Sequence, residues 1–494
     1  MPARTGEQFI AGLRAQPRDL WIGGQRVDDP VTHPAFRNVL RSLAALYDLQ
    51  HDPTRRDEMT YVSPTSGERV GLSFLIPHTR EDLTRVRRMM KIWADYSGGM
   101  MGRTPDYLNR ALMAFAAAAD YCGENDPRFA QHLRAYYTLV RERDLCLTHT
   151  LINPQANRAV GPGGQADPHL AARLVSETDR GLIIRGARML VTLPLADELM
   201  VFPSTLLRAG EDDRPYAFAF AIPCGTRGLR FLCRETFDPG GSTFDYPLSS
   251  RFEEMDAVVV FDDVLVPWER VFLLGDVERC NKAFSATGAV AHMAHQVVTK
   301  NIAKSEFILG IASLLADAIA VEGFQHVQGK IAEIIYYLEA MKAFVRASEA
   351  DAAADRWGTM TPAWPPLDAA RNMFTWMYPR MIEILQFLGA SGLMGRPTRA
   401  DLDAAALRPV IDRYYQAARL NAEDRVRLFR LAWDVALSAF GARQVLYERF
   451  FFGDPVRMQM ATFGSYDRRS AMDRVRDFLK RAEREVPELP ASPA

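Results

Sequence analysis

The sequence contains little cysteine, and its cysteines do not form a metal-binding or disulfide pattern. Of the 494 residues, 5 are cysteines, and they lie far apart at Cys122, Cys146, Cys224, Cys233 and Cys280. Their number is odd and no C-x-x-C pair occurs, which argues against a zinc site or a disulfide framework. We therefore expect a reduced, cytoplasmic protein. No apolar segment precedes a cleavage site near Met1, so we expect no secretory leader.

Excess charge of one sign and long hydrophobic runs are also absent. Lys and Arg number 60 while Asp and Glu number 61, so we expect neither a nucleic-acid partner nor a membrane partner. The most apolar runs, such as residues 309–321, contain charges and fall short of a membrane span. With 48% apolar and 24% charged residues, the composition is typical of a soluble globular protein. The length allows about two or three packed units.

Dinucleotide-binding motifs are missing as well. No G-x-G-x-x-G follows a predicted strand, so we expect no nicotinamide-binding fold. Residues 323–330 superficially resemble a phosphate-binding loop. Their glycines are too far apart, however, and Ile331 stands where that loop requires serine or threonine.

Helical periodicity is present at both ends of the chain. Near the N-terminus it covers residues 36–47, a segment starting after Thr79, residues 105–123 with Gly123 as the C-cap, and residues 127–143. After Pro267 four long periodic segments follow, at 302–320, 331–350, 373–388 and 426–447, as in a helical bundle.

The middle of the chain has the pattern of short strands. Apolar β-type runs separated by Gly, Pro and Asp occupy residues 182–186, 187–192, 198–202, 216–222, 229–233 and 257–261. No long helix interrupts them, which favours an antiparallel sheet or barrel over a parallel α/β unit. We therefore predict an α+β, mainly α protein with three domains: an N-terminal helical domain (1–144), a middle β domain (145–275) and a C-terminal helical bundle (276–494).

One segment has the residues of an anion-binding helix start. Thr104 can cap a helix whose first residue is Pro105, and Arg103 and Tyr107 lie on either side of this start. A guanidinium, a phenol and the positive end of a helix would then converge on a site for an anionic oxygen. Taken alone, such a helix start is more often purely structural.

Several longer segments resemble one enzyme family. Residues 261–267 (FDDVLVP) resemble the strand that leaves the middle domain of acyl-CoA dehydrogenase-type flavoproteins. Residues 102–109, 145–158 (LCLTHTLINPQANR), 186–188 with Thr192, and 452–457 (FGDPVR) are similar to the 4-hydroxyphenylacetate 3-monooxygenase oxygenase component family. The resemblance covers nearly the whole chain, and the motifs follow the family's order.

The resemblance implies an acyl-CoA dehydrogenase-like fold whose middle domain is an antiparallel β-barrel. It also implies a two-component monooxygenase that uses FADH2, supplied in trans by a separate NAD(P)H:flavin reductase, together with O2. Such an enzyme hydroxylates a phenol related to 4-hydroxyphenylacetate at the ortho position, through a flavin C4a-hydroperoxide, and gives a catechol. The family forms homo-oligomers, usually tetramers, so the C-terminal end of residues 276–494 is expected to include an oligomerisation tail.

The resemblance also assigns roles to residues of this chain. Arg103, Tyr107 and His149 would surround the phenol oxygen and the reactive edge of the flavin, as catalytic and substrate-binding residues. Ser204 and Thr205 would hold the acidic tail of the substrate. The flavin would be contacted by Gln155, Ala156, Asn157, Arg158, Gly161, Pro162, Gly163, Gly164 and Thr192, and, from a neighbouring subunit, by Gly453, Asp454, Pro455 and Arg457.

The chemistry of phenol hydroxylation suits these residue types. The ring is attacked more readily as a phenolate, so His149 would accept or share the phenol proton. Arg103 would stabilise the anionic oxygen, and Tyr107 would add a directed hydrogen bond. The reactive oxygen species must be kept from water, and the polar loop 209–215 is our candidate lid, although an ordinary solvated loop explains it equally well.

The sequence leaves the substrate open and disfavours two related enzyme classes. The substrate is left open between 4-hydroxyphenylacetate, tyrosine, a halogenated phenol and a carrier-bound phenol. A 4-hydroxybutyryl-CoA dehydratase-like enzyme holds an iron-sulfur cluster with three cysteines and a histidine. His295 stands near the expected histidine, but position 302 is isoleucine and residues 100–103 contain no cysteine. An acyl-CoA dehydrogenase-like enzyme needs a carboxylate base, which this set of residues lacks. His292 and His295 are one turn apart without a third ligand, so no metal is expected.

Overall fold

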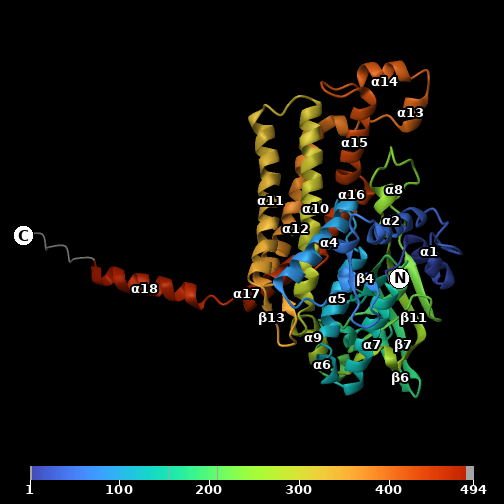
Figure 1. Cartoon of the computed structure of the whole chain (residues 1–494), viewed down its shortest axis with the longest axis vertical. Coiled ribbons are helices and arrows are strands. Elements are labelled where there is room, and N and C mark those ends of the chain that lie inside the picture. The colour runs from blue at the N-terminus through green and yellow to red at the C-terminus, as the bar shows by residue number, and fades with distance from the viewer. Residues whose placement is uncertain (1–2, 155, 209, 486–494) are drawn as a thin grey trace, which may run out of the picture.

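Helices form both ends of the chain, and the β region built from its middle lies at one side of the molecule, with β6 (Arg173–Thr178), β7 (Gly181–Thr192) and β11 (Asp256–Pro267) at its edge (Figure 1). The computed structural model of the protein describes residues 3–154, 156–208 and 210–485. The N-terminal helices are α1 (Gly6–Ala15), α2 (Arg37–Asp48), α3 (Arg56–Met59), α4 (Arg80–Tyr96), α5 (Pro105–Ala117), α6 (Asp120–Gly123) and α7 (Pro127–Arg143). Between them lie the short strands β1 (Asp19–Ile22), β2 (Gln25–Arg26), β3 (Thr60–Val62) and β4 (Arg69–Gly71).

Local capping explains where several of these helices begin and end. Thr79 accepts a hydrogen bond from the backbone N–H of Asp82, and the Asp82 carboxylate accepts from the backbone of Thr79, which confirms the predicted start of α4. Asp126 caps α7 in front of Pro127. The same helix ends at Asp144, whose φ of 47° places it in the left-handed conformation.

Two predicted helices are each divided in the structure. Residues 105–123 form α5 and the short α6 because the backbone tightens between them, with the N–H of Ala119 bonding to the carbonyl of Ala116. Residues 426–447 form α15 (Ala422–Ala436) and the start of α16 (Ala439–Phe450). Ser438 ends the continuity because its hydroxyl accepts the N–H of Gly441 and caps a new helix.

The β region consists of two sheets. Its strands are β5 (Leu147–Thr150), β6 (Arg173–Thr178), β7 (Gly181–Thr192), β8 (Glu198–Val201), β9 (Phe218–Pro223), β10 (Leu229–Cys233), β11 (Asp256–Pro267) and β12 (Val271–Leu274), with the short helix α8 (Ser249–Phe252) before β11. One sheet has the order β2-β1-β10-β11-β7-β6 and the other β12-β9-β8-β5. Most pairs are antiparallel, as predicted, but β1 with β10 and β5 with β8 are parallel.

Within the described residues the strands do not close into the β-barrel that the family resemblance implies. The only backbone bridge between the two sheets in the described residues is the isolated one between Ile152 and Met189, and no continuous ladder joins them. Thr148 and Thr150 of β5 add hydrogen bonds from their hydroxyls to backbone carbonyls of β7. The larger sheet also includes β1 and β2, which lie within residues 1–144. The N-terminal part of the chain therefore helps to build the β region, and the domain boundary near residue 144 stays a prediction.

Long helices form the C-terminal bundle. They are α9 (Val277–Ala286), α10 (Ala289–Ala318), α11 (Gln325–Ala350), α12 (Trp364–Gly389), α13 (Arg399–Asp403), α14 (Arg408–Tyr414), α15, α16, α17 (Pro455–Ser465) and α18 (Arg469–Glu485), with a small hairpin of β13 (Ala353–Ala354) and β14 (Met360–Thr361). α10 packs against α4, α5, α11 and α12, so the bundle and the N-terminal helices share one hydrophobic core. Within the part of the chain that the structure describes, no helix is apolar and long enough to cross a membrane.

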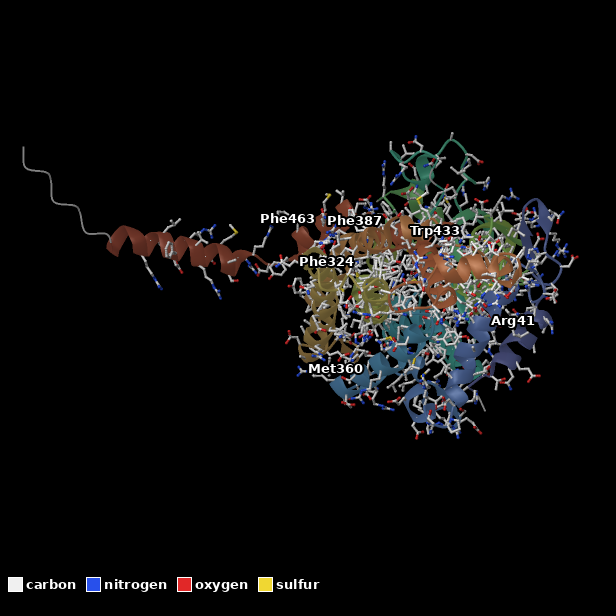
Figure 2. The ribbon with its side chains drawn as sticks, turned by 90° about the horizontal axis from the view of Figure 1, so that it is seen from above. Arg41, Phe324, Met360, Phe387, Trp433 and Phe463 are labelled. Atoms are coloured by element: carbon white, nitrogen blue, oxygen red, sulfur yellow. The ribbon has the colours of Figure 1, made fainter. Side chains whose placement is uncertain are left out.

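The last helix stands apart from the rest of the molecule. In both whole-molecule views α18 projects away from the bundle (Figures 1 and 2). It carries exposed apolar side chains at Met472, Val475, Phe478 and Leu479. Their spacing places them along one face of the helix, which is typical of a helix that packs against another protein surface.

Candidate active site

The start of α5, the strand β5 and the end of α16 meet in the interior. Arg103 precedes α5, Tyr107 lies in its first turn, and His149 lies on β5, where it pairs with Met200 of β8. The guanidinium carbon of Arg103 is 4.4 Å from the ring centre of Tyr107. The ring centres of Tyr107 and His149 are 5.9 Å apart. The structure therefore brings the three residues together, as a shared site requires, while their roles stay a prediction.

Thr104 does not cap α5 in the predicted way. It occupies the N-cap position, but its hydroxyl makes no capping hydrogen bond. Instead the hydroxyl accepts a long hydrogen bond, 3.5 Å, from Nε2 of Gln296 on α10. Because the hydroxyl points toward α10, it does not stabilise the helix start. The start of α5 is stabilised instead by Pro105 and by packing against the bundle.

His149 is held as a neutral imidazole. It is buried, and burial lowers the pKa of its ring well below the usual 6.5, with the nearby positive charge of Arg103 as a second cause. Its Nδ1 atom is buried without a hydrogen-bond partner. A neutral ring nitrogen with no protein partner is suited to exchange a hydrogen bond with a ligand.

Arg103 keeps donors that the described part of the protein does not satisfy. Its Nη1 donates to the hydroxyl of Tyr447 at 2.5 Å, whereas its Nε is buried without a partner. Among the described residues no carboxylate forms an ion pair with this guanidinium. Although burial alone would lower the pKa of Arg103, interactions with Tyr447, Tyr107 and Glu254 raise it overall, so the group stays charged. An unneutralised cation remains available to an anionic ligand.

Aromatic rings surround the polar groups. The ring centre of Phe451, just after α16, lies 4.9 Å from the guanidinium carbon of Arg103 and 5.8 Å from the ring centre of Tyr107. Phe202, just after β8, lies 5.0 Å from the ring of His149. These rings lower the local dielectric and present flat apolar surfaces, which suits an aromatic ligand with one charged oxygen.

The predicted flavin contacts occupy several places around this site. Thr192, at the end of β7, is buried and donates its hydroxyl to Asp256 at 2.8 Å. Residues 453–457 follow Phe451 and Phe452 and begin α17, where Asp454 accepts the N–H of Val456 and of Arg457. Gln155 lies outside the described residues, and Ala156, Asn157 and Arg158 are exposed.

The glycine-rich loop packs against the candidate lid. Pro162–Gly164 form a single 3₁₀ turn, and the N–H of Gly163 donates to Asp213 at 2.8 Å. Asp213 belongs to the 3₁₀ helix Glu211–Tyr216 and also accepts from the N–H of Arg208. A Cβ on Gly163 would lie 2.4 Å from the carbonyl oxygen of Asp212, so only glycine fits this contact. The described part of the candidate lid, residues 210–215, is therefore anchored in this structure, and its movement as a lid stays a prediction. Ala209 lies outside the described residues.

Ser204 and Thr205 follow Phe202 on the chain. Ser204 is buried and Thr205 is partly exposed. Because Phe202 contacts His149, this segment lies close to the cluster of Arg103, Tyr107 and His149. Contact of the two hydroxyls with an acidic substrate tail stays a prediction.

The residues at the site fit a bound flavin and a phenol. Arg188 on β7 is fully buried, and its Nε and Nη2 have no partner, while Nη1 donates to the carbonyl of Leu151. Burial lowers the pKa of Arg188 to about 10, so it remains largely charged at neutral pH. With Arg103, it gives the interior two guanidinium groups with unused donors, and carbonyl, phosphate or phenolate oxygens would satisfy them.

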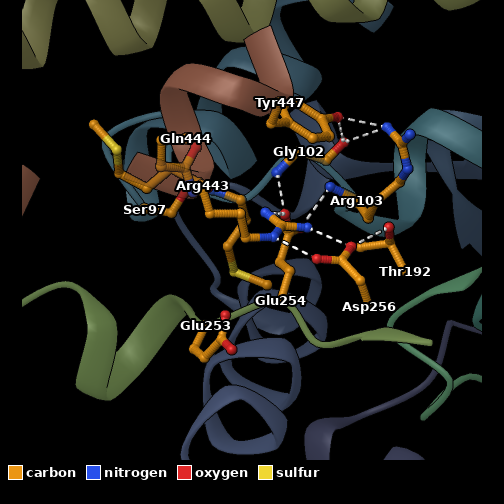
Figure 3. A network of polar contacts seen from close by, with 12 residues as sticks. Ser97, Gly102, Arg103, Thr192, Glu253, Glu254, Asp256, Arg443, Gln444 and Tyr447 are labelled. Atoms are coloured by element: carbon orange, nitrogen blue, oxygen red, sulfur yellow. Dashed lines mark hydrogen bonds and ion pairs between the residues drawn. The ribbon is translucent and has the colours of Figure 1, made fainter. Parts of the chain in front are cut away.

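Sequence reasoning missed a buried polar network behind Arg103. Figure 3 shows Arg443 and Tyr447 of α16 facing Gly102 and Arg103, with Glu254 between them. Arg443 also forms a two-bond ion pair with Asp256 at 2.6 and 2.7 Å. Burial opposes ionisation of Asp256, but Arg443 holds its pKa at about 2. The only signal in the sequence was the spacing of polar residues at 443, 444, 447 and 448, which gives α16 one polar face.

The two histidines of α10 lie close to charged side chains. Nε2 of His295 lies 2.8 Å from the Glu349 carboxylate, and Nδ1 of His292 lies 3.3 Å from Nη2 of Arg110. Both rings are buried. In the described part of the chain no group of three or more metal-ligating side chains is present.

The neutral state of His149 gives an expectation for the pH dependence. Because the pKa of His149 lies well below 6.5, its protonation should not reduce activity until the pH falls well under that value. We expect kcat/KM for conversion of the substrate to show no decrease near pH 6.5 as the pH is lowered. A pH profile from 5.5 to 8 checks this, and a step near 6.5 that disappears in His149→Asn would contradict it.

Comparison with known proteins identifies close relatives. The family model described as "4-hydroxyphenylacetate 3-hydroxylase N terminal" matches residues 5–273, and "4-hydroxyphenylacetate 3-hydroxylase C terminal" matches residues 280–480. The 4-hydroxyphenylacetate 3-monooxygenase oxygenase component of Thermus thermophilus is 53% identical over 99% of this chain and 100% of its own length. A Rhodococcus 4-nitrophenol 2-monooxygenase oxygenase component is 33% identical over 94% of this chain and 88% of its own.

A solved structure of this kind matches the whole fold. The crystal structure of a 4-hydroxyphenylacetate 3-monooxygenase oxygenase component with FAD and 4-hydroxyphenylacetate superimposes with a TM-score of 0.94. It shares 53% sequence identity, with coverage of 97% of this chain and 99% of the other. The expected acyl-CoA dehydrogenase-like fold class is thereby confirmed.

Proposed function

Because the chain belongs to the 4-hydroxyphenylacetate 3-hydroxylase family, we propose that the cluster of Arg103, Tyr107 and His149 is the place where it hydroxylates a phenol. The protein is the oxygenase component of a two-component, FAD-dependent phenol hydroxylase. The observation that carries the assignment of the site is the pair of buried, unpartnered atoms, Arg103 Nε and His149 Nδ1, within one aromatic enclosure. A phenol oxygen placed there would satisfy both.

The residues of the site divide the work of activating the phenol. Arg103 stabilises the phenolate oxygen, since its charge is not neutralised by a carboxylate, and so makes the ring electron-rich. Neutral His149 accepts the hydrogen bond of the phenol and shares its proton as the phenolate forms. Tyr107, Phe202 and Phe451 enclose the ring and exclude water. Reduced FAD, when bound, would supply the two electrons that activate O2, from which one oxygen atom is transferred to the ring and the other leaves as water.

Thr192, at the end of β7, would contact the flavin. The oxygen of the Thr192 hydroxyl can still accept a hydrogen bond while its proton is donated to Asp256. Residues 156–158, the glycine-rich loop 161–164 and residues 453–457 would complete the site, the last group reaching flavin bound by a neighbouring subunit.

Two partners follow from this proposal. A separate NAD(P)H:flavin reductase delivers reduced FAD, as the description of the relative as an oxygenase component implies.

A second copy of the chain covers the apolar face of α18, which includes Val475 and Phe478. Light scattering should then give a multiple of the 55.5 kDa chain mass, with a tetramer as the expected state, and a monomer would contradict this. A cytoplasmic location is part of the proposal.

The substrate proposed is 4-hydroxyphenylacetate or a close phenol. The test supplies chemically reduced FAD, O2 and 4-hydroxyphenylacetate to the purified protein and measures catechol product by mass spectrometry. Tyrosine, a chlorophenol and 4-nitrophenol in parallel reactions distinguish the alternative phenols. Hydrogen peroxide without hydroxylated product from every phenol would contradict the proposed function.

A further inference from the structure

A buried carboxylate and a buried phenol hold Arg103 from two sides. Glu254, which is 1% exposed, accepts the N–H of Arg103 through Oε1 at 2.6 Å and the N–H of Gly102 through Oε2 at 3.0 Å. Both oxygens of one carboxylate thus fix the backbone that carries the guanidinium (Figure 3). Such hydrogen bonds to an ionised acceptor are short and directional.

Tyr447 fixes the other end of the side chain. Its hydroxyl accepts from Nη1 of Arg103 at 2.5 Å and lies 3.4 Å from the carbonyl oxygen of Gly102. Burial raises the pKa of Tyr447 well above 10, so the phenol stays neutral. A neutral acceptor orients the guanidinium without cancelling its charge, whereas a carboxylate at this place would form an ion pair and compete with an anionic ligand.

The carboxylate of Glu254 forms no hydrogen bond with the guanidinium of Arg103. Its oxygens are occupied by the two backbone N–H groups and by Arg443, whose Nη1 lies 3.6 Å from Oε2. Glu254 therefore helps to keep Arg103 charged in the interior but does not occupy its donors. The Nε atom remains without a partner and is left for the ligand.

We propose that Glu254 and Tyr447 are positioning residues that aim the Nε edge of Arg103 at the phenol oxygen while leaving its charge unneutralised. Both come from regions far from α5 in the sequence: Glu254 precedes β11, and Tyr447 lies on α16 of the bundle. Gln444 of the same helix strengthens this arrangement, because its Nε2 donates to the carbonyl of Met100 at 2.8 Å. The inference rests on the proposed function of the Arg103 site.

The chain offers a matched control for each positioning residue. Glu253 is also buried, but its carboxylate accepts from Arg234 and from the N–H of Phe237. Tyr378 is a fully buried tyrosine of α12 whose hydroxyl has no partner. The variants Glu253→Gln and Tyr378→Phe therefore remove the same chemical groups without touching residues 102 and 103.

The first measurement follows the ionisation of a bound phenol without turnover. 4-Nitrophenol is titrated with flavin-free protein, and the phenolate absorbance is recorded against pH for the unchanged protein and for Glu254→Gln, Tyr447→Phe, Glu253→Gln and Tyr378→Phe. We expect the pKa of the bound phenol to rise by roughly one unit in Glu254→Gln and Tyr447→Phe, because a misdirected guanidinium stabilises the phenolate less. The two control variants should match the unchanged protein.

The second measurement uses chemically reduced FAD, O2 and 4-hydroxyphenylacetate. We expect the catechol formed per O2 consumed to fall by about tenfold in both positioning variants, as for the loss of a hydrogen bond to a charged group. A purely structural role would lower the amount of folded enzyme but not this ratio. If Glu254→Gln fails to fold, the smaller change Tyr447→Phe decides.

The outcomes separate the inference from the function on which it rests. One outcome is that the unchanged protein hydroxylates a phenol and both positioning variants show the same catechol formed per O2 consumed, and the same pKa of the bound phenol, as the unchanged protein. The positioning role is then overturned and the proposed function stands. If the unchanged protein hydroxylates no phenol, both are overturned. A loss of coupling as large in the controls as in the positioning variants would also overturn the inference.

Discussion

Replacing Arg103 with glutamine is expected to lower kcat/KM for phenol hydroxylation by about 10²–10³-fold, the usual effect of removing one donor to a developing oxyanion. The variant keeps a polar side chain near Tyr447 but loses the charge that stabilises the phenolate. Lysine in place of Arg103 should restore only part of the activity. Its single nitrogen cannot replace both Nη1, which bonds to Tyr447, and Nε, which is left for the ligand. The measurement is product formation at a saturating concentration of reduced FAD.

The comparison of two substrates tells which anion Arg103 binds. 4-Hydroxyphenylacetate carries a phenol and a carboxylate, whereas 4-methylphenol carries only the phenol. If Arg103 binds the phenol oxygen, Arg103→Gln should reduce hydroxylation of both by a similar factor. A large loss for 4-hydroxyphenylacetate with an unchanged rate for 4-methylphenol would mean that Arg103 binds the acidic tail. Gln416→Ala, at an exposed site on the α14–α15 connection, serves as a control for handling and yield.

Replacing His149 with alanine is expected to uncouple oxygen use from hydroxylation. Without the neutral ring nitrogen, the phenol loses the acceptor of its proton, and catechol formation should fall by about 10²–10⁴-fold. Oxygen consumption continues and ends as hydrogen peroxide, because the flavin still reacts while the ring is not activated. The affinity for FAD should stay nearly unchanged, since the role assigned to His149 is toward the phenol.

The control for this variant is a histidine outside the site. His132 on α7 lies 3.1 Å from the carbonyl oxygen of Val271 through its Nδ1, and His132→Ala should keep the normal ratio of catechol to peroxide. The measurements are an oxygen electrode trace, a peroxide assay and an FAD titration. Equal loss of FAD binding and hydroxylation in His149→Ala would show that His149 only supports the structure.

Local signals in the sequence were sufficient where one short segment determines the structure. Pro105 predicted the start of α5, and Thr79 with Asp82 predicted the start of α4. The convergence of Arg103 with Tyr107 followed from the same reasoning, because both are within a few residues of one helix end. The placement of His149 beside them came from the family resemblance, since nothing local links β5 to α5.

Features that depend on contacts between distant segments were not predictable in this way. The hydroxyl of Thr104 points to Gln296 on α10 and makes no helix cap. The strands form two sheets because no continuous backbone ladder joins β5 to β7 in the described residues, which alternation of apolar residues cannot reveal. Glu254 has no local pattern that sets it apart from other buried polar residues, the polar spacing on α16 does not single out Tyr447, and only the fold brings the two residues to Arg103.

A crystal structure of the protein with oxidised FAD and 4-hydroxyphenylacetate tests the central claim most directly. The account predicts that the phenol oxygen lies within about 3.2 Å of a guanidinium nitrogen of Arg103 and of a ring nitrogen of His149, with the acidic tail toward Ser204 and Thr205. The reverse orientation, with the carboxylate on Arg103 and the phenol oxygen remote from His149, would contradict it.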